Sequence, residues 1–521
     1  MIKRVFWDYL PAVLTGFLLI CSFPRLDQGY LAWVALVPLL LSAFRWEPNK
    51  AFWLGGAAGL VANLGIFYWV INAMVVYGGL PIVVALLILL LLVGFLSLYT
   101  AVFSFLISYL AKDNSFLRWT LPPLLWTTLE FLRAHIMSGF PWASLGYSQY
   151  LYLPIIQTAE VTGFYGVTFL IVLVTSTVAT FLHESLKDER KLIIKISTDK
   201  MLLTGLLVFL VNFAFGTLRI GQIETHLNES SAYVNVSLIQ GNITQDKKWD
   251  EAYRDEIFKT HLELTRESLR DKPDLVIWPE SSVPFLFLRD KVYTKELLDF
   301  VSEEKVFLLF GGDYLKGEKD NYQAFNSAFL LSPGPKLLGR YDKNHLVPFG
   351  EYIPLKSLLF FVNKMVVGEM DYSAGGELNI LKIPRGAFGV QICYEIIFPE
   401  LSRRLALKGA DFMAVVTNDA WFGRTSAPYQ HFSMMVFRAI ETRRPFVRAA
   451  NTGITGGVDQ VGRITSASPI FVKGVFPEKI RLSNNKQTLY SRSGDAFAMA
   501  VALITIILTG LRFLHVRKER L

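Results

Sequence analysis

Two hydrophobic patterns divide the chain. Residues 1–220 and 495–521 contain long apolar runs separated by short polar stretches, whereas 221–494 carries charged residues throughout. A helix needs about 20 apolar residues to cross a bilayer. The pattern therefore predicts a membrane domain of eight transmembrane helices, at 8–24, 29–44, 51–74, 81–111, 117–134, 161–183, 201–220 and 495–514. The first two runs are short, and a single re-entrant hairpin is the alternative for them.

The segment between the seventh and eighth apolar runs shows a different pattern of apolar and polar residues. Short β-rich runs alternate there with amphipathic stretches, and this alternation predicts one α/β sandwich domain. The expected strands are 233–239, 274–278, 306–311, 325–331, 387–393 and 411–417, and the expected helices are 250–270, 294–303, 398–409 and 428–443. We therefore expect three parts: seven spans in 1–220, a catalytic domain in 221–494, and an eighth span with a basic tail in 495–521.

Cationic residues predict the orientation of these spans. Lys and Arg gather at both ends of the chain and in every second connection, whereas 75–80 and 136–160 contain neither. By the positive-inside rule, both termini are then cytoplasmic and 221–494 faces the opposite side. The first apolar run resembles a signal peptide, but no small-residue cleavage site follows it, so we expect a retained helix.

Composition supports a membrane protein. Charged residues make up 18% of the chain, compared with about 25% in an ordinary soluble domain. The net charge of +8 does not predict nucleic-acid binding, because the surplus cations lie beside apolar runs. Cys21 and Cys393 are the two cysteines of the sequence. One lies in an apolar run and the other in the charged segment, so no disulfide between them is expected.

Three reactive side chains follow apolar runs in the charged segment: Glu280 after Trp-Pro, Lys343 after Tyr-Asp, and Cys393 after Val-Gln-Ile. A thiol needs a base or a cation to become a nucleophilic thiolate. A carboxylate beside apolar residues suits general-base work, and an ammonium can stabilise an oxyanion. Each residue alone has an ordinary alternative: a buried Cys, a helix-capping Glu and a solvated Lys. Together they predict acyl transfer through a thioester.

This set resembles the nitrilase, or carbon–nitrogen hydrolase, superfamily, whose catalytic residues are Glu, Lys and Cys in this order. The resemblance covers about 235–460 and includes the run Thr417–Gly423 and the run Arg438–Thr442. It implies an αββα sandwich. It also implies that a second carboxylate, Glu351, supports the lysine and the base.

The membrane half extends the resemblance to the apolipoprotein N-acyltransferase family over nearly the whole chain. The matching runs are Gly139–Trp142, Leu145–Gln149, Gln240–Ile243 with Trp249, and Val347–Pro354. The resemblance implies a catalytic triad of Glu280, Lys343 and Cys393, with supporting, oxyanion or substrate-binding residues at Trp249, Glu351, Tyr394, Glu395, Trp142 and Trp421.

The implied reaction is ping-pong. Cys393 takes the sn-1 acyl chain of a phospholipid as a thioester and passes it to the α-amino group of the diacylglyceryl-cysteine that begins an apolipoprotein. The implied partners are this phospholipid donor, the apolipoprotein acceptor and membrane lipids, without nucleic acid. We expect a monomer in the bacterial inner membrane, with the catalytic domain in the periplasm. Neither a cofactor nor a metal is expected, since the sequence lacks a His pair at ligand spacing.

Several alternatives stay open. A membrane-tethered amidase or nitrilase that hydrolyses small amides would use the same three residues, and a transporter or lipid-binding scaffold with a degenerate enzyme domain is a rival from another class. The apolar run 360–370 suits either a core or a membrane-dipping lid. Trp421 and Phe422 could wall an acyl tunnel or fill a core, and Phe140–Tyr147 could form an interfacial belt or a lipid portal. Polar residues in or beside the spans, such as Glu130 and Asn63, are either structural or functional.

Overall fold

A computed structural model describes residues 2–185, 199–229, 232–248, 250–317, 322–354, 371–482 and 487–520. The chain forms two compact units. The first contains 1–71, 82–220 and 493–521, and the second contains 72–81 and 221–492. Each unit is described by itself below.

The first unit consists of helices. Its long helices are α1 (Ile2–Ser22), α4 (Pro48–Phe67), α6 (Ile82–Ala111), α7 (Ser115–His135), α10 (Phe164–Ser185), α12 (Lys200–Glu229, of which 200–220 belongs to this unit) and α19 (Ala496–Arg520). Shorter elements are η1 (Gly29–Leu31), α2 (Ala32–Ala35), α3 (Val37–Arg45), η3 (Leu145–Gln149), α8 (Leu153–Ile156) and α9 (Ala159–Thr162).

Within the described residues, five helices are long and apolar enough to cross a membrane: α4, α6, α10, α12 and α19. Residues 7–22 and 29–45 form shorter apolar helical stretches, and the second of these is broken into pieces. The helix α7 carries the charged residues Arg118, Glu130 and Arg133. The unit is therefore consistent with a membrane protein, and the expected count of eight spans stays a prediction.

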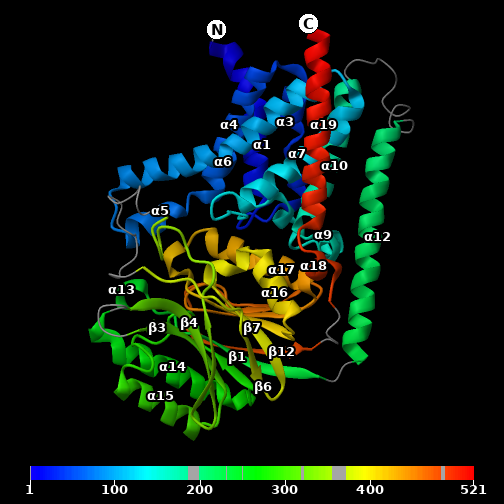
Figure 1. The fold of residues 1–521 in the computed structure, drawn as a ribbon. Helices are drawn as coiled ribbons and strands as arrows, with labels where there is room; N and C mark the ends of the chain where they lie inside the picture. Colours follow the sequence, from blue (N-terminus) through cyan, green and yellow to red (C-terminus); the bar gives the residue numbers. More distant parts are fainter. Residues whose placement is uncertain are drawn as a thin grey trace. The chain divides into compact units, whose positions relative to one another are not determined.

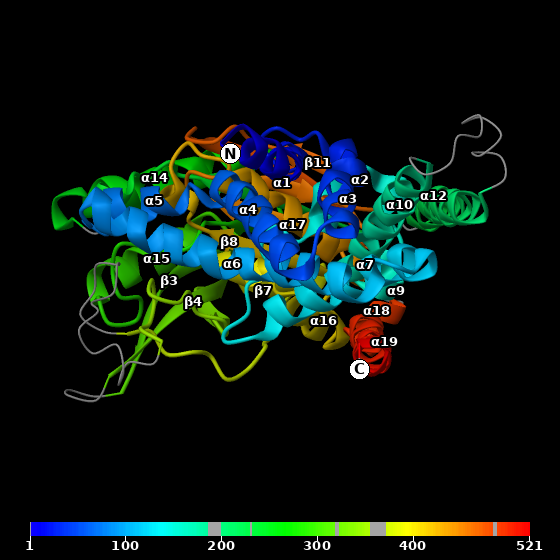
Figure 2. The same ribbon diagram turned by 90° about the horizontal axis from the view of Figure 1, so that it is seen from above.

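Small residues let the helices of this unit approach closely. A Cβ atom placed on Gly59 of α4 would lie 2.9 Å from the Cα atom of Ser97 in α6. Contacts of this kind bring α4 against α6 along much of its length (Figure 2). Because lipid tails offer no hydrophobic gain to helix pairing, close packing of small residues is what stabilises such contacts in a bilayer.

The second unit contains two mixed sheets of six strands each, counted over the described residues. The first has the order β12-β1-β2-β3-β4-β5 and the second β11-β10-β9-β8-β7-β6. The strands are β1 (Tyr233–Gln240), β2 (Leu275–Ile277), β3 (Leu308–Lys316), β4 (Gln323–Ser332), β5 (Lys336–Asp342), β6 (Ile380–Ile383), β7 (Gly386–Ile392), β8 (Phe412–Thr417), β9 (Phe446–Ala450), β10 (Gly456–Val458), β11 (Ile464–Ala467) and β12 (Gly474–Arg481).

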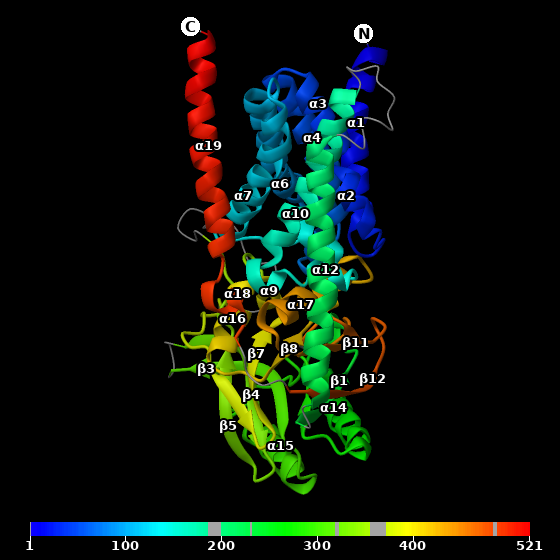
Figure 3. The ribbon, with the colours of Figure 1, turned by 90° about the vertical axis from the view of Figure 1, so that its right-hand side faces the viewer.

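Helices cover the outer face of each sheet (Figures 1 and 3). The helices α14 (Arg254–Ser268) and α15 (Lys291–Glu303) pack on the first sheet, and α16 (Pro399–Leu407) and α17 (Ala427–Thr442) pack on the second. The core between the first sheet and its helices is rich in aromatic residues, with Trp278, Phe310 and Phe329 fully buried. The expected αββα sandwich is the fold of this unit.

The elements expected from the sequence all have counterparts in this unit, and six strands were not expected: β5, β6, β9, β10, β11 and β12. The run expected to end as a strand at Cys393 instead ends at Ile392, because Cys393 has a positive φ of 52° and begins a 3₁₀ turn. The apolar run 360–370 and Trp249 lie outside the described residues.

A segment between two helices of the first unit belongs to the second. The helix α4 ends at Phe67, before the expected end of the third span at residue 74. Residues 72–81 then form part of the second unit. Within that unit, the Asn72 side chain donates a hydrogen bond to the carbonyl oxygen of Trp421 at 2.9 Å. The ring of Tyr77 packs edge-on against that of Trp421, with 5.4 Å between the centroids.

Candidate active site

Glu280 lies in a tight turn after β2. The preceding Trp278 is fully buried, and its indole N–H donates to the Thr265 hydroxyl at 2.8 Å. The turn packs directly on Gly311 of β3, where a Cβ atom would lie 2.7 Å from the Cα atom of Glu280. Only glycine leaves room for this approach. The turn therefore holds the Glu280 carboxylate in a fixed position, with 7% of the residue exposed.

Lys343 immediately follows β5 and is 1% exposed. Its Nζ atom lies 2.7 Å from Glu351 Oε1 and 3.6 Å from Glu280 Oε1. Burial by itself would lower the pKa of Lys343, but the charges of Glu351 and Glu280 raise it above its ordinary value. The lysine is therefore a permanent cation between two carboxylates. An ammonium has three N–H bonds, so a third donor is left for an oxyanion.

Asn326 of β4 joins the two carboxylates. Its side-chain Nδ2 donates to Glu280 Oε1 at 2.8 Å and to Glu351 Oε1 at 3.1 Å. The second oxygen of Glu280 accepts from the backbone N–H of Asn418 at 2.9 Å, and the second oxygen of Glu351 accepts from that of Val347 at 2.8 Å. These donors satisfy buried carboxylates that would otherwise be costly.

Cys393 sits at the start of η6 (Cys393–Ile397), directly after β7. Its positive φ is rare for a residue with a side chain. Burial and the nearby charge of Glu280 raise the pKa of its thiol, whereas Lys343 and a hydrogen bond with the Thr417 side chain lower it. The net direction is upward, so the resting group is a thiol. Forming the thiolate then requires transfer of its proton to a base, and Glu280 is the carboxylate whose charge acts most strongly on it.

Glu395 fixes the backbone around the thiol and is fully buried. Its carboxylate accepts from the backbone N–H groups of Ile392 at 2.7 Å, Asn344 at 2.6 Å and His345 at 3.1 Å, and from the Tyr341 hydroxyl at 2.9 Å. Burial raises the pKa of Glu395 to about 7, although these hydrogen bonds oppose the rise. The carboxylate therefore ties the segment around Lys343 to the turn that carries Cys393.

A second buried network reaches Cys393 from the other side. His431 Nε2 lies 3.1 Å from the carbonyl oxygen of Cys393, and His431 Nδ1 lies 3.1 Å from Asp419 Oδ1. Asp419 also accepts from the Thr417 hydroxyl at 3.0 Å and pairs with Arg448. Both networks hold the strained turn of the thiol.

The remaining predicted residues occupy different places. Tyr394 follows the thiol and packs against Phe398, with 5.2 Å between ring centroids, and burial raises the pKa of its hydroxyl. Trp421 lies in the turn after β8, next to Asn72 and Tyr77. Trp142 belongs to the first unit, where it is 1% exposed and packs on Trp69 at 5.0 Å.

Sequence reasoning missed Asn326, Lys248, Gln245 and Arg448. Asn326 lies inside an expected strand, β4, and Arg448 lies inside an unexpected one, β9. No sequence motif marks either residue. Asp419 and Asn418 lie within the run Thr417–Gly423, which was singled out as a family feature, but neither was assigned a role. His431 lies in an expected helix, where a lone histidine carries no signal for a contact with the backbone of Cys393.

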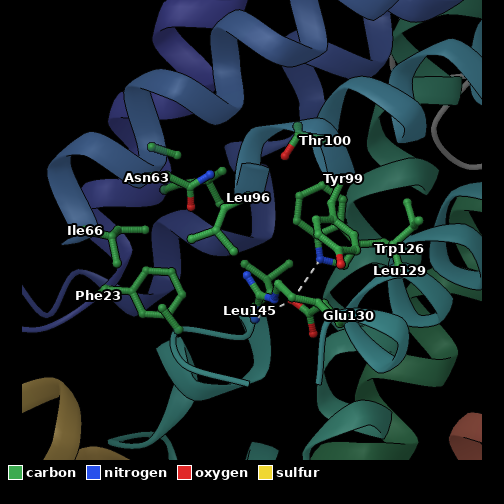
Figure 4. A pocket seen from close by; sticks show the side chains of 14 residues that line it. Phe23, Asn63, Ile66, Leu96, Tyr99, Thr100, Trp126, Leu129, Glu130 and Leu145 are labelled. Atoms are coloured by element: carbon green, nitrogen blue, oxygen red, sulfur yellow. Dashed lines mark hydrogen bonds between the residues drawn. The ribbon is translucent and has the colours of Figure 1, made fainter. Parts of the chain in front are cut away.

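The first unit contains a pocket of its own, with a cavity volume of about 60 Å³. Its walls are mainly apolar, and Leu96 and Phe23 project into it in Figure 4. Asn63 and Thr100, both more than nine-tenths buried, also line it, together with Arg133. The Glu130 carboxylate lies at the edge of this pocket. It accepts hydrogen bonds from the backbone N–H of Leu145 at 2.7 Å and from the side chains of Trp126 and Thr168.

Comparisons with known proteins match both units. A sequence model described as the apolipoprotein N-acyltransferase N-terminal domain matches residues 15–177, and one described as carbon–nitrogen hydrolase matches residues 235–487. The chain is 42% identical over 507 residues to the apolipoprotein N-acyltransferase of Geobacter metallireducens, covering 97% of this chain and 95% of that protein. It is 30% identical to that of Haemophilus ducreyi over 493 residues, covering 93% of each chain.

Among solved structures, the chain resembles Saccharomyces cerevisiae Nit3, a member of branch 10 of the nitrilase superfamily. The TM-score is 0.39 with 17% identity, and the match covers 51% of this chain and 95% of that one.

Proposed function

The chain belongs to the apolipoprotein N-acyltransferase family, and from this premise we propose that it moves the sn-1 acyl chain of a phospholipid onto the N-terminal amine of lipoproteins. The acceptor is the α-amino group of a diacylglyceryl-cysteine. The observation that carries the proposal is the buried set of Cys393, Lys343 and Glu280 in a carbon–nitrogen hydrolase domain. Glu280, Lys343 and Cys393 are its catalytic residues.

The first half-reaction loads the enzyme. The Cys393 thiol gives its proton to Glu280, and the sulfur attacks the carbonyl carbon of the sn-1 ester. Lys343 and backbone N–H groups, including that of Tyr394, stabilise the tetrahedral oxyanion. The C–O bond then breaks, Glu280 returns the proton to the leaving lysophospholipid, and a thioester remains on Cys393.

The second half-reaction transfers the acyl chain from Cys393 to the lipoprotein. The lipoprotein amine attacks the thioester carbon, and Glu280 accepts the amine proton. The C–S bond breaks, the thiolate of Cys393 takes up a proton from Glu280, and an amide forms. Because a thioester lies well above an amide in free energy, no nucleotide is needed. A site with little water favours the amine over hydrolysis.

The buried ion pair of Lys343 and Glu351 supports these roles. Glu351 takes one ammonium N–H at 2.7 Å, while the Glu280 carboxylate stands further off, at 3.6 Å. The cation is thereby held in place without using the base as its main partner. Glu280 can then lose its charge to a proton while Lys343 stays paired.

The pocket of the helical unit supports a lipid as the donor. It combines apolar walls (Figure 4) with the guanidinium of Arg133 and the polar side chains of Asn63 and Thr100. A glycerolipid would match both features, with its chain on the apolar walls and its ester or phosphate oxygens toward the Arg133 cation.

We further propose that the protein lies in the bacterial inner membrane as a monomer, with both termini cytoplasmic and the second unit in the periplasm. The alternating basic connections support this orientation. Alkaline phosphatase fused within the second unit should be active in cells, and the same enzyme fused after Leu521 should be inactive. The reverse pattern contradicts the orientation.

The function is tested with a labelled phospholipid donor and an unlabelled acceptor peptide. Purified protein is mixed with a phospholipid carrying a labelled sn-1 chain and with a synthetic diacylglyceryl-cysteine peptide. We expect the label on the peptide amine and lysophospholipid in equal amount. Free fatty acid without labelled peptide, or release of ammonia from small amides instead, would favour the membrane-tethered amidase.

A further inference from the structure

Lys248 is a second buried lysine of the second unit that the mechanism above does not use. It ends the short helix α13 (Gln245–Lys248) and is 3% exposed. Its Nζ atom donates to the backbone carbonyl oxygen of Glu280 at 2.9 Å. A buried ammonium is costly in free energy unless hydrogen bonds and opposite charges surround it. A lysine at this position therefore suggests a function beyond packing.

The charges around Lys248 belong to the proposed active site. The groups that act on it are Glu280 from the turn after β2, Asp313 from β3 and Cys393 from the turn after β7. His261 of α14 is also close enough to be affected by its charge, and burial lowers the pKa of that imidazole to about 4. Two carboxylates and the thiol therefore act on the charge of Lys248, and Lys248 in turn acts on His261.

The same short helix also reaches the carboxylate of Glu280. Gln245 precedes Lys248 by three residues, so both side chains lie on one face. Gln245 Oε1 accepts from the Asn418 side chain at 2.8 Å, and the Asn418 backbone N–H donates to Glu280 Oε2 at 2.9 Å. The helix thus holds Glu280 at its main chain directly and at its side chain through one residue.

We propose that Lys248 is a positioning residue for thioester formation, which fixes the Glu280 main chain and supplies a second positive charge for the ionised thiol. This inference rests on the proposed function. When the thiol proton moves to Glu280, one negative charge moves from the carboxylate to sulfur. Lys248 acts on both groups, as Lys343 does, so the charge moves within the field of two cations and not one.

The proposal predicts a pH signature. Burial lowers the pKa of Lys248 to about 8, although Glu280, Asp313 and Cys393 oppose the change. Below pH 8 the residue is a cation and assists the thiolate, and above pH 8 it becomes neutral and the assistance is lost. A residue needed only for packing would matter equally at every pH.

The test measures alkylation of Cys393 by iodoacetamide in the full chain, in a Cys21→Ser background, from pH 6.5 to 9.5. The variants are Lys248→Met, Lys248→Gln and Lys248→Arg. The matched control is Lys247→Met, whose side chain is 41% exposed. We expect wild type to react about tenfold faster than Lys248→Met at pH 6.5, as for one unit of thiol pKa, and the ratio to approach one at pH 9.5. Lys247→Met should match wild type.

The other two variants separate charge from the hydrogen bond and from folding. Lys248→Gln keeps a donor but lacks the charge, so it should be as slow as Lys248→Met at pH 6.5. Lys248→Arg should match wild type at pH 6.5 and react faster than wild type at pH 9.5, because a guanidinium keeps its proton over this range. If Lys248→Met does not fold, the Gln and Arg pair decides the question. A rate ratio that is constant with pH, or an Arg variant as slow as the Gln variant, overturns the proposal. Alkylation needs no lipid, so loss of the proposed function would show separately, as wild type that transfers no acyl chain.

Discussion

Glu351 and Lys343 form a buried ion pair, with 2.7 Å between Glu351 Oε1 and Lys343 Nζ and at most a tenth of either side chain exposed. Both lie in one short stretch after β5, so local chain geometry builds the pair. Its effect is to neutralise the cation locally, so that the charge of the more distant Glu280 can change during the reaction.

Replacing Glu351 by Gln should slow acylation of Cys393 by at least about tenfold and lower the melting temperature. The variant keeps an acceptor for the Val347 N–H but leaves a buried ammonium with a weaker partner, and breaking such a pair costs about 3–5 kcal/mol. The measurements are acyl-enzyme formation and thermal unfolding. Glu303→Gln, at an exposed position in α15, is the control, and equal behaviour of the two variants contradicts the role of Glu351.

Replacing Glu280 by Gln should abolish thioester formation while the fold is kept. The amide cannot take the thiol proton, and the resting group is a thiol because burial and Glu280 raise its pKa. Mass spectrometry after mixing with phospholipid should find no acyl group on the variant. Normal loading, with Glu296→Gln as the exposed reference, would rule out Glu280 as the base.

Replacing Glu395 by Gln should reduce both stability and turnover. The amide nitrogen would face backbone N–H donors that now bind a carboxylate oxygen, such as that of Asn344 at 2.6 Å. A buried donor left unsatisfied costs about 1–3 kcal/mol, and the turn of Cys393 loses its anchor. Thermal unfolding and the acyl-transfer rate measure the effect. The control is Glu400→Gln in α16, where the Glu400 side chain is 52% exposed, and it should change neither the melting temperature nor the acyl-transfer rate. A Glu395→Gln variant as stable and as active as this control would contradict the account.

Acid should destabilise the second unit through His261. Burial lowers the pKa of this residue from 6.5 to about 4, so the unfolded chain binds its proton at a higher pH than the folded one. The contribution is fully present above pH 6.5 and is lost as the pH falls toward 4, by about 3 kcal/mol in all. Melting temperatures of wild type and His261→Phe between pH 4 and 7 test this. The variant should lose part of the acid sensitivity, and parallel curves would contradict the assignment.

The sequence was most informative where chemistry follows a local apolar run. Glu280, Lys343 and Cys393 each come directly after a strand or an apolar stretch, and strand ends of a sandwich meet at its edges. The alternation of short β-rich runs with helical stretches indicated the domain class. The length of the apolar runs indicated helices such as α6 and α10.

Residues whose positions depend on the pairing of distant strands could not be predicted from the sequence. Asn326 joins the two carboxylates because β4 pairs with β3 and β5, and no local signal fixes that pairing. The strands β9 to β12 were missed because several are short or carry Gly and charged residues, as in Gly456–Val458 and Gly474–Arg481. The positive φ of Cys393 could not be predicted either, since a residue with a side chain rarely adopts it.

The central claim is that Cys393 carries the acyl chain, and intact-protein mass spectrometry tests it most directly. Wild type is mixed with a phospholipid of defined sn-1 chain, and one half is then chased with a diacylglyceryl-cysteine peptide. Both halves are weighed intact and again after digestion. The account predicts one acyl mass on the peptide that contains Cys393, absent in Cys393→Ala, unchanged in Cys21→Ser, and lost on addition of the acceptor. Transfer to the acceptor that continues in Cys393→Ala, or turnover without an acyl mass at Cys393, would contradict it.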